Sequence, residues 1–268
     1  MRITPTVEIG GGGPLALIAG PCVIESEEHV NMLATVLSKL AKDLGAPFVF
    51  KASFDKANRS SVKSYRGPGI KEGLRILKSV RDRGIAVLTD IHEPGQAALA
   101  AESVDIIQIP AFLCRQTDIL VEAGKTGRVV NIKKGQFVSP ADIRHAADKV
   151  ASTGNNRILL TERGTSFGYN NLVVDMRGLA IMRGFGWPVI FDATHSVQLP
   201  GAAGAASGGQ PEFIEPLASA AVAVGVDAVF IEVHEAPERA LSDGANALRL
   251  DKLEGMMRKL KRISLAAH

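Results

Sequence analysis

The chain has 268 residues, of which 46% are hydrophobic and 22% are charged, and its formal net charge is +3. This composition is typical of an aliphatic globular core and excludes a fibrous repeat or a disordered chain. The absence of long lysine or arginine blocks gives nucleic-acid binding little support, and no apolar stretch is long enough to predict a membrane span. We expect neither a nucleic-acid nor a membrane partner.

The two cysteines are too few for a disulfide framework, which favours a reducing compartment. The N-terminus also lacks the basic and apolar regions of a signal peptide, so we expect a cytoplasmic protein. Cys114 has no neighbouring base in the sequence that would activate its thiol, and we expect it to pack in the core.

Short runs rich in Val, Ile, Leu and Phe recur along the chain, each followed by a segment with helical spacing of apolar residues. The expected strands are residues 15–22, 47–54, 86–91, 106–111, 128–134, 157–164, 188–195 and 228–235. Amphipathic segments such as 29–45 and 70–84 end in glycine, which is common just beyond a helix C-terminus.

Eight such units are typical of a (β/α)8 TIM barrel. The pattern therefore predicts one α/β domain over residues 1–268, with residues 1–14 as an N-terminal extension. Counting units leaves an open, doubly wound sheet as the alternative. The glycine-rich segment 201–210 follows the seventh strand, and we interpret it as a mobile active-site loop, with a flexible connector as the simpler alternative.

Nearly every expected strand becomes polar or charged at its C-terminal end. The residues at these ends are Lys51 and Ser53, Asp90 and His92, Gln108, Lys133, Glu162 and Arg163, Asp192 and His195, and Glu232 and His234. In a barrel these ends meet at one mouth, where catalytic groups lie. Helix caps and turns explain one or two such residues, but they explain the whole set poorly.

Five cations lie on or just after three of the expected strands: Lys51, Lys56, Arg59, Lys133 and Arg163. Their convergence would suit phosphate and carboxylate groups, because arginine offers a planar fork of donors and lysine a compact charge. Solvated surface charge is the alternative for any one of them. A lysine within the apolar strand 47–54 is nevertheless unusual for a surface residue.

A metal site could use Cys22 at the end of the first strand, His195 after the seventh, Glu232 on the eighth and Asp243 in the next loop. Sulfur, nitrogen and oxygen donors together suit a borderline divalent ion such as Zn, Fe, Co or Mn. No local spacing motif supports the set. Taken singly, Cys22 is equally a small buried apolar residue, and His195 a structural histidine.

Eight segments together resemble the 3-deoxy-D-manno-octulosonate 8-phosphate synthases, in one order from about residue 15 to about residue 260. They are IAGPCVIES, FKASFDKANRSS, LTDIHEP, IQIPAFLCRQTD, NIKKGQF, LTERGTSFGYNNLVVDMR, FDATHSVQ and LSDGANAL. The resemblance implies a homotetrameric (β/α)8 barrel that condenses phosphoenolpyruvate with D-arabinose 5-phosphate and water. The implied products are 3-deoxy-D-manno-octulosonate 8-phosphate, a lipopolysaccharide precursor, and inorganic phosphate.

Two other functions remain as alternatives. The related 3-deoxy-D-arabino-heptulosonate 7-phosphate synthases use a four-carbon sugar phosphate, but they generally carry a KPRTS-like sequence where residues 56–61 of this chain read KANRSS. A noncatalytic sugar-phosphate sensor would have no need for the full set of ligand, cation and loop positions.

The resemblance also implies roles for individual residues. Those implied to bind substrate are Lys51, Ser53, Lys56, Asn58, Arg59, Ser60, Gln108, Ala111, Phe112, Lys133 and Arg163, together with Arg115 reaching from a neighbouring subunit. Catalytic roles fall to Lys56, Asp90, His195 and Asp243. Asp90 would contact the sugar or the catalytic water.

The resemblance further implies one divalent metal ion per subunit. Metal-independent members carry asparagine where this chain has Cys22, and Cys22, His195, Glu232 and Asp243 complete the metal-using pattern. The chain departs from the family at Glu235 and at Arg249, where proline is usual. Both flank the last loop, and they make its conformation less predictable.

Overall fold

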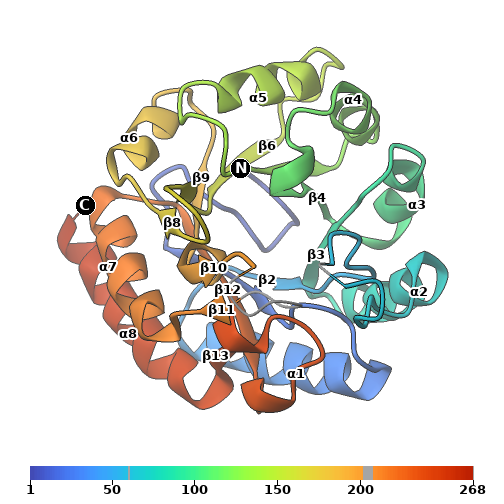
Figure 1. Ribbon diagram of the computed structural model, residues 1–268, viewed down its shortest axis with the longest axis horizontal. Helices are drawn as coiled ribbons and strands as arrows, with labels where there is room; N and C mark the ends of the chain where they lie inside the picture. The colour runs from blue at the N-terminus through green and yellow to red at the C-terminus, as the bar shows by residue number, and fades with distance from the viewer. Residues whose placement is uncertain (60, 202–207, 268) are drawn as a thin grey trace.

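The computed structural model describes residues 1–59, 61–201 and 208–267. Eight parallel strands form a closed barrel in the order β1-β2-β3-β4-β5-β6-β9-β12, with β12 pairing back to β1 (Figure 1). The strands are β1 Ala16–Gly20, β2 Phe48–Lys51, β3 Ala86–Asp90, β4 Ile106–Ile109, β5 Val129–Lys133, β6 Ile158–Glu162, β9 Val189–Asp192 and β12 Ala228–His234. The closure, with Ala16 opposite Ala228, excludes the open sheet and confirms the predicted (β/α)8 barrel.

Helices surround the barrel (Figure 1). They are α1 Glu27–Asp43, α2 Ile70–Asp82, α3 Gln96–Ser103, α4 Thr117–Lys125, α5 Ile143–Ala151, α6 Arg177–Arg183, α7 Ile214–Val224 and α8 Leu250–Ala267. Short 3-10 helices are η1 Ala111–Leu113, η2 His195–Val197, η3 Pro211–Phe213, η4 Pro237–Arg239 and η5 Gly244–Asn246. None of the helices within the described ranges combines the length and apolarity that crossing a membrane requires.

Helix α1 illustrates how the sequence sets these boundaries. The Ser26 side chain accepts a hydrogen bond from the backbone N–H of His29 at 3.1 Å, which caps the helix. Glu27 and Glu28 add negative charge to the first turn, which the helix dipole favours. The helix therefore begins before the predicted segment 29–45, and its buried side chains recur at helical spacing and face the strands.

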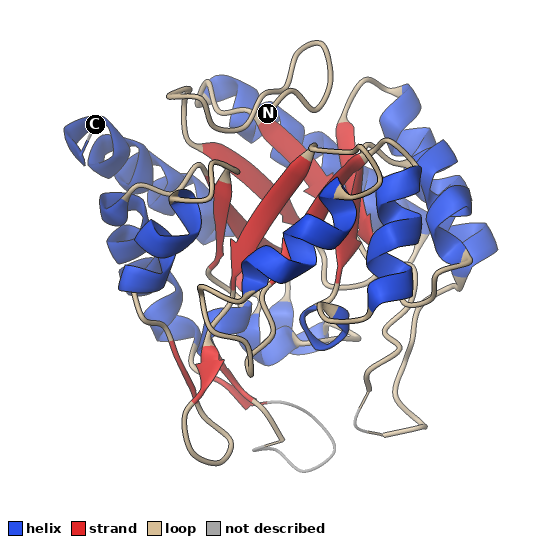
Figure 2. Ribbon diagram, turned by 90° about the horizontal axis from the view of Figure 1, so that it is seen from above, coloured by secondary structure: helices blue, strands red, loops and turns tan. Residues whose placement is uncertain are grey.

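The N-terminal segment fills the end of the barrel where the strands begin. Arg2 and Glu8 form an antiparallel bridge, and the side chains of Ile3, Val7 and Ile9 are buried. They join a cluster of side chains from the first residues of the strands. Figure 2 shows the N-terminus at one end of the barrel and the short strands at the other. Residues 1–14 thus contribute core packing.

The opposite end carries three additions to the barrel. The strands β7 Thr165–Ser166 and β8 Leu172–Val173 pair, as do β10 Gln198–Leu199 and β11 Gly208–Gly209, and β13 Leu248–Arg249 pairs with the end of β12. These strands follow β6, β9 and β12, so they build walls around the C-terminal mouth. The predicted loop 201–210 lies partly outside the described residues, since residues 202–207 are not among them.

Candidate active site

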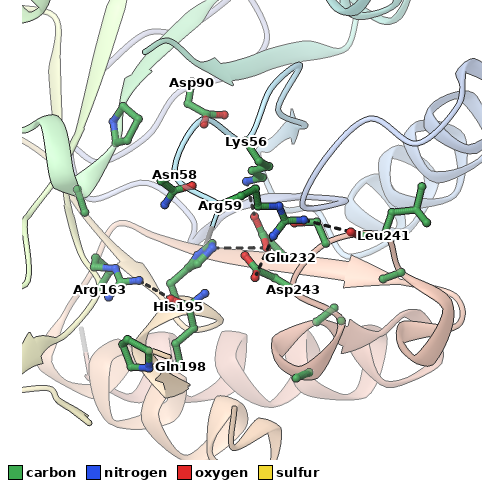
Figure 3. Close-up of a pocket in the computed structure, with 18 of the residues that line it drawn as sticks. Lys56, Asn58, Arg59, Asp90, Arg163, His195, Gln198, Glu232, Leu241 and Asp243 are labelled. Atoms are coloured by element: carbon green, nitrogen blue, oxygen red, sulfur yellow. Dashed lines mark hydrogen bonds and ion pairs between the residues drawn. The ribbon is translucent and has the colours of Figure 1, made fainter. Parts of the chain in front are cut away.

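A cavity of about 1260 Å³ opens at the C-terminal ends of the strands (Figure 3). The predicted site residues that line it are Lys51, Lys56, Asn58, Arg59, Asp90, Gln108, Ala111, Phe112, Lys133, Arg163, His195, Glu232 and Asp243. Cys22 and Ser53 lie behind the lining and contact Asp243 and Asp90, respectively. Arg115 is exposed, with its backbone oxygen bound by Lys149. Ser60 lies outside the described residues.

A buried ion pair lies at the base of the cavity. Lys51 donates to Glu232 Oε1 at 2.5 Å and to the carbonyl oxygen of Cys22 at 2.8 Å, and both charged side chains are almost completely buried. Gly20 lets the backbones of β1 and β2 lie close together here, because a Cβ at this position would lie 1.9 Å from the Lys51 carbonyl oxygen. Despite burial, nearby cations, chiefly Lys51, hold the pKa of Glu232 well below its usual range.

A second set of charges joins β5 to β9. Lys133 Nζ donates to Asp192 Oδ2 at 2.5 Å and lies 3.8 Å from the ring centre of Phe230. Asp192 Oδ2 also lies 2.8 Å from His195 Nδ1, and Oδ1 accepts the His195 backbone N–H. This contact assigns the proton to Nδ1, so His195 Nε2 is left to face Glu232 Oε2 at 3.5 Å.

Arg163 presents a guanidinium group to the cavity from the end of β6. Its Nη2 donates to Gln198 Oε1 at 2.7 Å (Figure 3). Its Nη1 is buried, and no residue in the described part of the chain is within hydrogen-bonding reach of it. Burial lowers the pKa of Arg163, although an arginine stays charged. An anionic ligand group would satisfy this donor.

Lys56 and Arg59 reach the mouth from the segment after β2. Lys56 Nζ lies 4.0 Å from Glu232 Oε1. Burial opposes its charge, but the nearby carboxylates of Glu232, Asp90 and Asp243 favour it, and the pKa of Lys56 is raised. Arg59 donates to the carbonyl oxygens of Tyr65 and Leu241, each at 3.1 Å. These contacts join the segment after β2 to the loop after β12.

Asp90 lies on the other side of the mouth. One of its oxygens accepts a hydrogen bond from Ser53 Oγ, and the other lies 3.2 Å from His92 Nε2. Burial opposes ionisation, but Lys56 and His92 outweigh it and hold the pKa of Asp90 well below its usual range. Asp90 is therefore a carboxylate near neutral pH, able to accept a proton or a hydrogen bond from a ligand.

Three of the four predicted metal ligands form one group. Donor atoms of Cys22, Glu232 and Asp243 lie within 4.8 Å of one another, and His195 approaches the group through Nε2. Glu232 Oε2 is buried, and within the described ranges it has no hydrogen-bond partner. Burial and the charge of Glu232 raise the pKa of the Cys22 thiol. A cation bound among these atoms would satisfy the free oxygen and favour the thiolate.

Sequence reasoning noted Asp192 only as a polar strand end and missed Gln198 altogether. The structure gives Asp192 contacts with two predicted site residues and gives Gln198 a contact with Arg163. The position of Asp192 at the end of a strand could have indicated a site residue. Gln198 follows a 3-10 helix, and no sequence pattern indicates that it belongs to the site. Cys114 packs in the core between the barrel and its helices, as expected.

The two departures from the family pattern occupy different surroundings. Glu235 accepts a hydrogen bond from the ring of His29, which lies on α1, far from Glu235 in the sequence. Arg249 lies near Glu238 at 3.8 Å and near Asp251 at 3.4 Å. Neither residue displaces a predicted metal ligand.

The family is established by comparison with known proteins. The DAHP synthetase I family matches residues 1–267, and this chain belongs to it. A relative from Syntrophotalea carbinolica is 61% identical over 258 residues, which are 96% of this chain and 93% of the relative. A relative from Geobacter sulfurreducens is 60% identical over 259 residues, 96% of this chain and 95% of the relative. Both relatives are named 2-dehydro-3-deoxyphosphooctonate aldolase.

The depressed pKa values of Asp192 and Glu232 predict a loss of stability in acid. Each carboxyl binds its proton less readily in the folded protein than at its ordinary pKa of 3.8 or 4.5, so the unfolded chain takes up more protons as the pH falls. Their stabilisation is complete above these ordinary values. We expect the free energy of unfolding to fall between about pH 5 and about pH 3, by about 1–3 kcal/mol for each carboxylate.

Urea unfolding at several pH values would measure this loss. Asp192→Asn should flatten the pH dependence, whereas Glu102→Gln, at an exposed site, should leave it unchanged. An Asp192→Asn protein with the same slope as the unmodified chain would show that this carboxylate is not responsible.

Proposed function

We propose that the chain condenses phosphoenolpyruvate with D-arabinose 5-phosphate and water, forming 3-deoxy-D-manno-octulosonate 8-phosphate and inorganic phosphate for lipopolysaccharide synthesis. The observation that carries the proposal is the buried group of cations at the mouth, with the free Arg163 donor, in a chain so similar to the named relatives. The name of these relatives specifies an eight-carbon compound. Removing the three carbons of phosphoenolpyruvate leaves a five-carbon sugar, which disfavours the heptulosonate alternative.

Phosphoenolpyruvate takes the inner position, on Lys51, Lys56, Lys133 and Arg163. Its carboxylate and phosphate are the anionic groups that such cations bind, and burial strengthens each contact relative to water. Lys51 and Lys133 already neutralise internal carboxylates, whereas Arg163 Nη1 has no such partner among the described residues. Arg163 therefore orients the ligand most directly. Gln108, Ala111 and Phe112 complete the lining around it.

The sugar phosphate takes the outer position, with Asn58 and Arg59 on its phosphate side. Arg59 is held by two backbone carbonyl groups, so its guanidinium is positioned before the ligand arrives. Ser60 belongs to the same expected binding segment but lies outside the described residues. With its phosphate on this rim, the sugar directs its aldehyde toward the inner ligand.

The reaction forms one carbon–carbon bond and one carbon–oxygen bond, the latter from water, and breaks the carbon–oxygen bond to the phosphate. C3 of phosphoenolpyruvate attacks the aldehyde carbon, whose oxygen receives the electron pair and then a proton. Water adds to C2 and loses a proton, and the resulting hemiketal phosphate releases inorganic phosphate to leave the ketone. Lys56, kept charged by its carboxylate neighbours, stabilises the developing aldehyde oxygen. Asp90, kept ionised, accepts the proton from water.

We further propose one divalent metal ion per subunit, held by Cys22, His195, Glu232 and Asp243. The clustered donors and the partnerless Glu232 oxygen support this fit, and Asp192 on His195 Nδ1 is the outer carboxylate that such a histidine ligand commonly has. Mn, Fe, Co and Zn all suit the donor set. A bound ion would orient substrate oxygens, polarise the aldehyde or lower the pKa of a bound water.

Phosphate release from phosphoenolpyruvate should require arabinose 5-phosphate, and erythrose 4-phosphate should support it poorly. Arg163→Ala should lose about 2–5 kcal/mol of transition-state binding, because it removes a buried contact to an anion. The exposed Arg258→Ala is the matched control. Equal or better turnover with erythrose 4-phosphate would favour the heptulosonate alternative. Sugar-phosphate binding without phosphate release would favour a sensor.

Chelation should abolish activity, and added divalent ions should restore it. Cys22→Asn should weaken metal binding more than it weakens any metal-free turnover, because asparagine occupies this position in metal-independent relatives and the other three ligands remain. Cys114→Ala controls for loss of a buried thiol elsewhere. Metal content and turnover would be measured on the same stripped and reloaded samples. Full turnover by stripped protein would contradict the metal assignment.

We also propose a homotetramer in which Arg115 completes the sugar-phosphate site of a neighbouring subunit. Arg115 is exposed and lies outside the cavity lining of its own subunit, and Phe112 beside the mouth is 52% exposed, which suits an interface.

We also propose a cytoplasmic location for the protein. Cys22 and Cys114 form no disulfide, which supports a reducing compartment.

Complementation between inactive subunits tests the shared site. Arg115→Ala should raise KM for arabinose 5-phosphate, whereas Arg144→Ala, exposed on α5, should not. Co-expression of Arg115→Ala with Arg163→Ala should restore activity, because a mixed oligomer contains sites with both arginines intact. Sedimentation would confirm the tetramer. Co-expressed oligomers no more active than either variant would contradict the proposal.

A further inference from the structure

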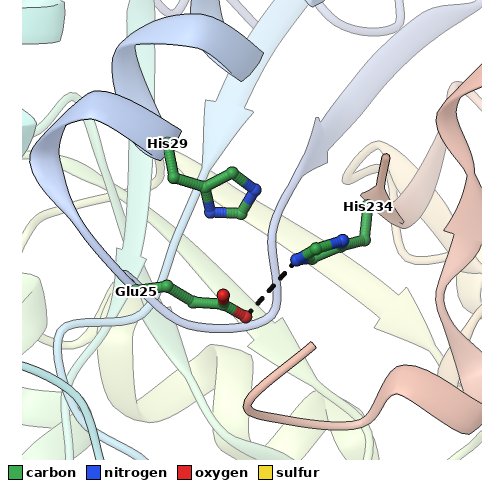
Figure 4. A group of neighbouring side chains, drawn as sticks. All are labelled: Glu25, His29 and His234. Carbon is green, nitrogen blue, oxygen red and sulfur yellow. Dashed lines mark ion pairs between the residues drawn. The ribbon is translucent and has the colours of Figure 1, made fainter. Parts of the chain in front are cut away.

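A second group of metal-ligating side chains lies outside the lining of the active-site cavity. Glu25 follows β1, His29 lies in the first turn of α1, and His234 ends β12 (Figure 4). Each offers one donor atom, and these atoms lie within 4.8 Å of one another. The His29 and His234 rings are 4.8 Å apart between centres. His234 is only 5% exposed.

The contacts of the two rings divide their nitrogens into two pairs. Glu235 Oε2 lies 2.9 Å from His29 Nε2 and 3.4 Å from His234 Nδ1, so one carboxylate oxygen faces a nitrogen of each ring. The other two nitrogens, His29 Nδ1 and His234 Nε2, are buried, and neither finds a hydrogen-bond partner in the portions of the chain described. His234 Nε2 lies 3.5 Å from Glu25 Oε1, too far for a good hydrogen bond.

We propose that Glu25, His29 Nδ1 and His234 Nε2 bind a second divalent metal ion of the borderline class, such as Zn²⁺. Two imidazoles and a carboxylate are a common donor set for this class, with water in the remaining position. Glu235 accepts the N–H group of His29 Nε2, and once an ion is bound to His234 Nε2 it can also accept an N–H group from His234 Nδ1. A carboxylate in that place fixes the ring tautomers and makes the imidazoles better ligands.

Binding requires one local change. The backbone N–H of Ala236 donates to His234 Nδ1 at 3.0 Å, which places the His234 proton on Nε2. A metal ion on Nε2 moves this proton to Nδ1, where Glu235 Oε2 accepts it and the Ala236 contact is lost. Glu235 is 45% exposed on its side chain, so it is free to shorten the 3.4 Å separation. The buried nitrogen without a partner gains one in return.

The ion would connect three elements that meet beside the active site. Glu25 Oε1 also accepts the backbone N–H of Leu241 at 2.8 Å, two residues before Asp243. The second site therefore joins the start of α1 and the end of β12 to the loop that supplies the proposed ligand of the first site. The two sites share no ligand, and the inference does not rest on the proposed reaction.

Cobalt titration distinguishes the two sites, because thiolate ligation gives Co²⁺ an intense near-ultraviolet charge-transfer band that a histidine and carboxylate site lacks. Metal-stripped, reduced protein would be titrated with Co²⁺, and bound metal would be counted after gel filtration. We expect two ions per chain, one with the thiolate band and one with visible d–d bands alone. His29→Gln should abolish the second ion and keep the thiolate band.

Two further variants sharpen the test. Glu235→Gln should weaken the second site by about 10- to 100-fold, as loss of an outer carboxylate partner does. His145→Gln, exposed on α5, should bind both ions normally. A single ion with no thiolate band, lost in His29→Gln, would support the second site and contradict the first. A His29→Gln protein that keeps the wild-type stoichiometry and visible spectrum would overturn the proposal, as would wild-type protein binding only the thiolate-ligated ion.

Discussion

Lys51 and Glu232 meet across the base of the mouth at 2.5 Å, and the surrounding site depends on this buried pair. Two ions removed from water lose more hydration free energy than a hydrophobic pair would, so such a contact is weak evidence for stability. Its effect is positional. Lys51 occupies one oxygen of Glu232 and leaves the other facing His195 and the donors of Cys22 and Asp243. Loss of Lys51 would leave the buried Glu232 carboxylate without its closest cation.

The mouth is therefore an internally neutralised set of charges rather than an open positive patch. Lys133 is bound to Asp192 and Lys51 to Glu232 before any ligand arrives, whereas Arg163 keeps a buried donor that has no partner among the described residues. An entering anion has to share these cations with the protein's own carboxylates. This sharing limits the affinity for any anion that makes a single contact, whereas a ligand with two anionic groups engages several cations together.

The barrel could be predicted from the sequence because parallel strands buried on both faces are continuous apolar runs, and because their polar ends coincide at one mouth. The site residues on strands followed from the same pattern. Gln198 and the pairing of Glu235 with His29 did not, since they join segments far apart in sequence with no shared spacing. The helix α1 began earlier than its apolar pattern, because Ser26 supplies a cap that periodicity alone does not reveal. The sequence predicts an N-terminal extension over residues 1–14, because the apolar side chains there are too few and too scattered to indicate burial.

The burial of Ile3, Val7 and Ile9 beneath the barrel has a consequence for synthesis of the chain. These side chains belong to one cluster with residues of the barrel strands, and the cluster includes Ile190 on β9 and Ala228 and Phe230 on β12. Ile3, Val7 and Ile9 are therefore synthesised long before some of their partners, and part of their apolar surface stays uncovered while the intervening strands assemble. Contacts of such long sequence separation form slowly, and the exposed segment is a point at which a nascent chain is open to aggregation or to a chaperone. The cluster around Ile3, Val7 and Ile9 is thus complete only when all the strands of the barrel have come together.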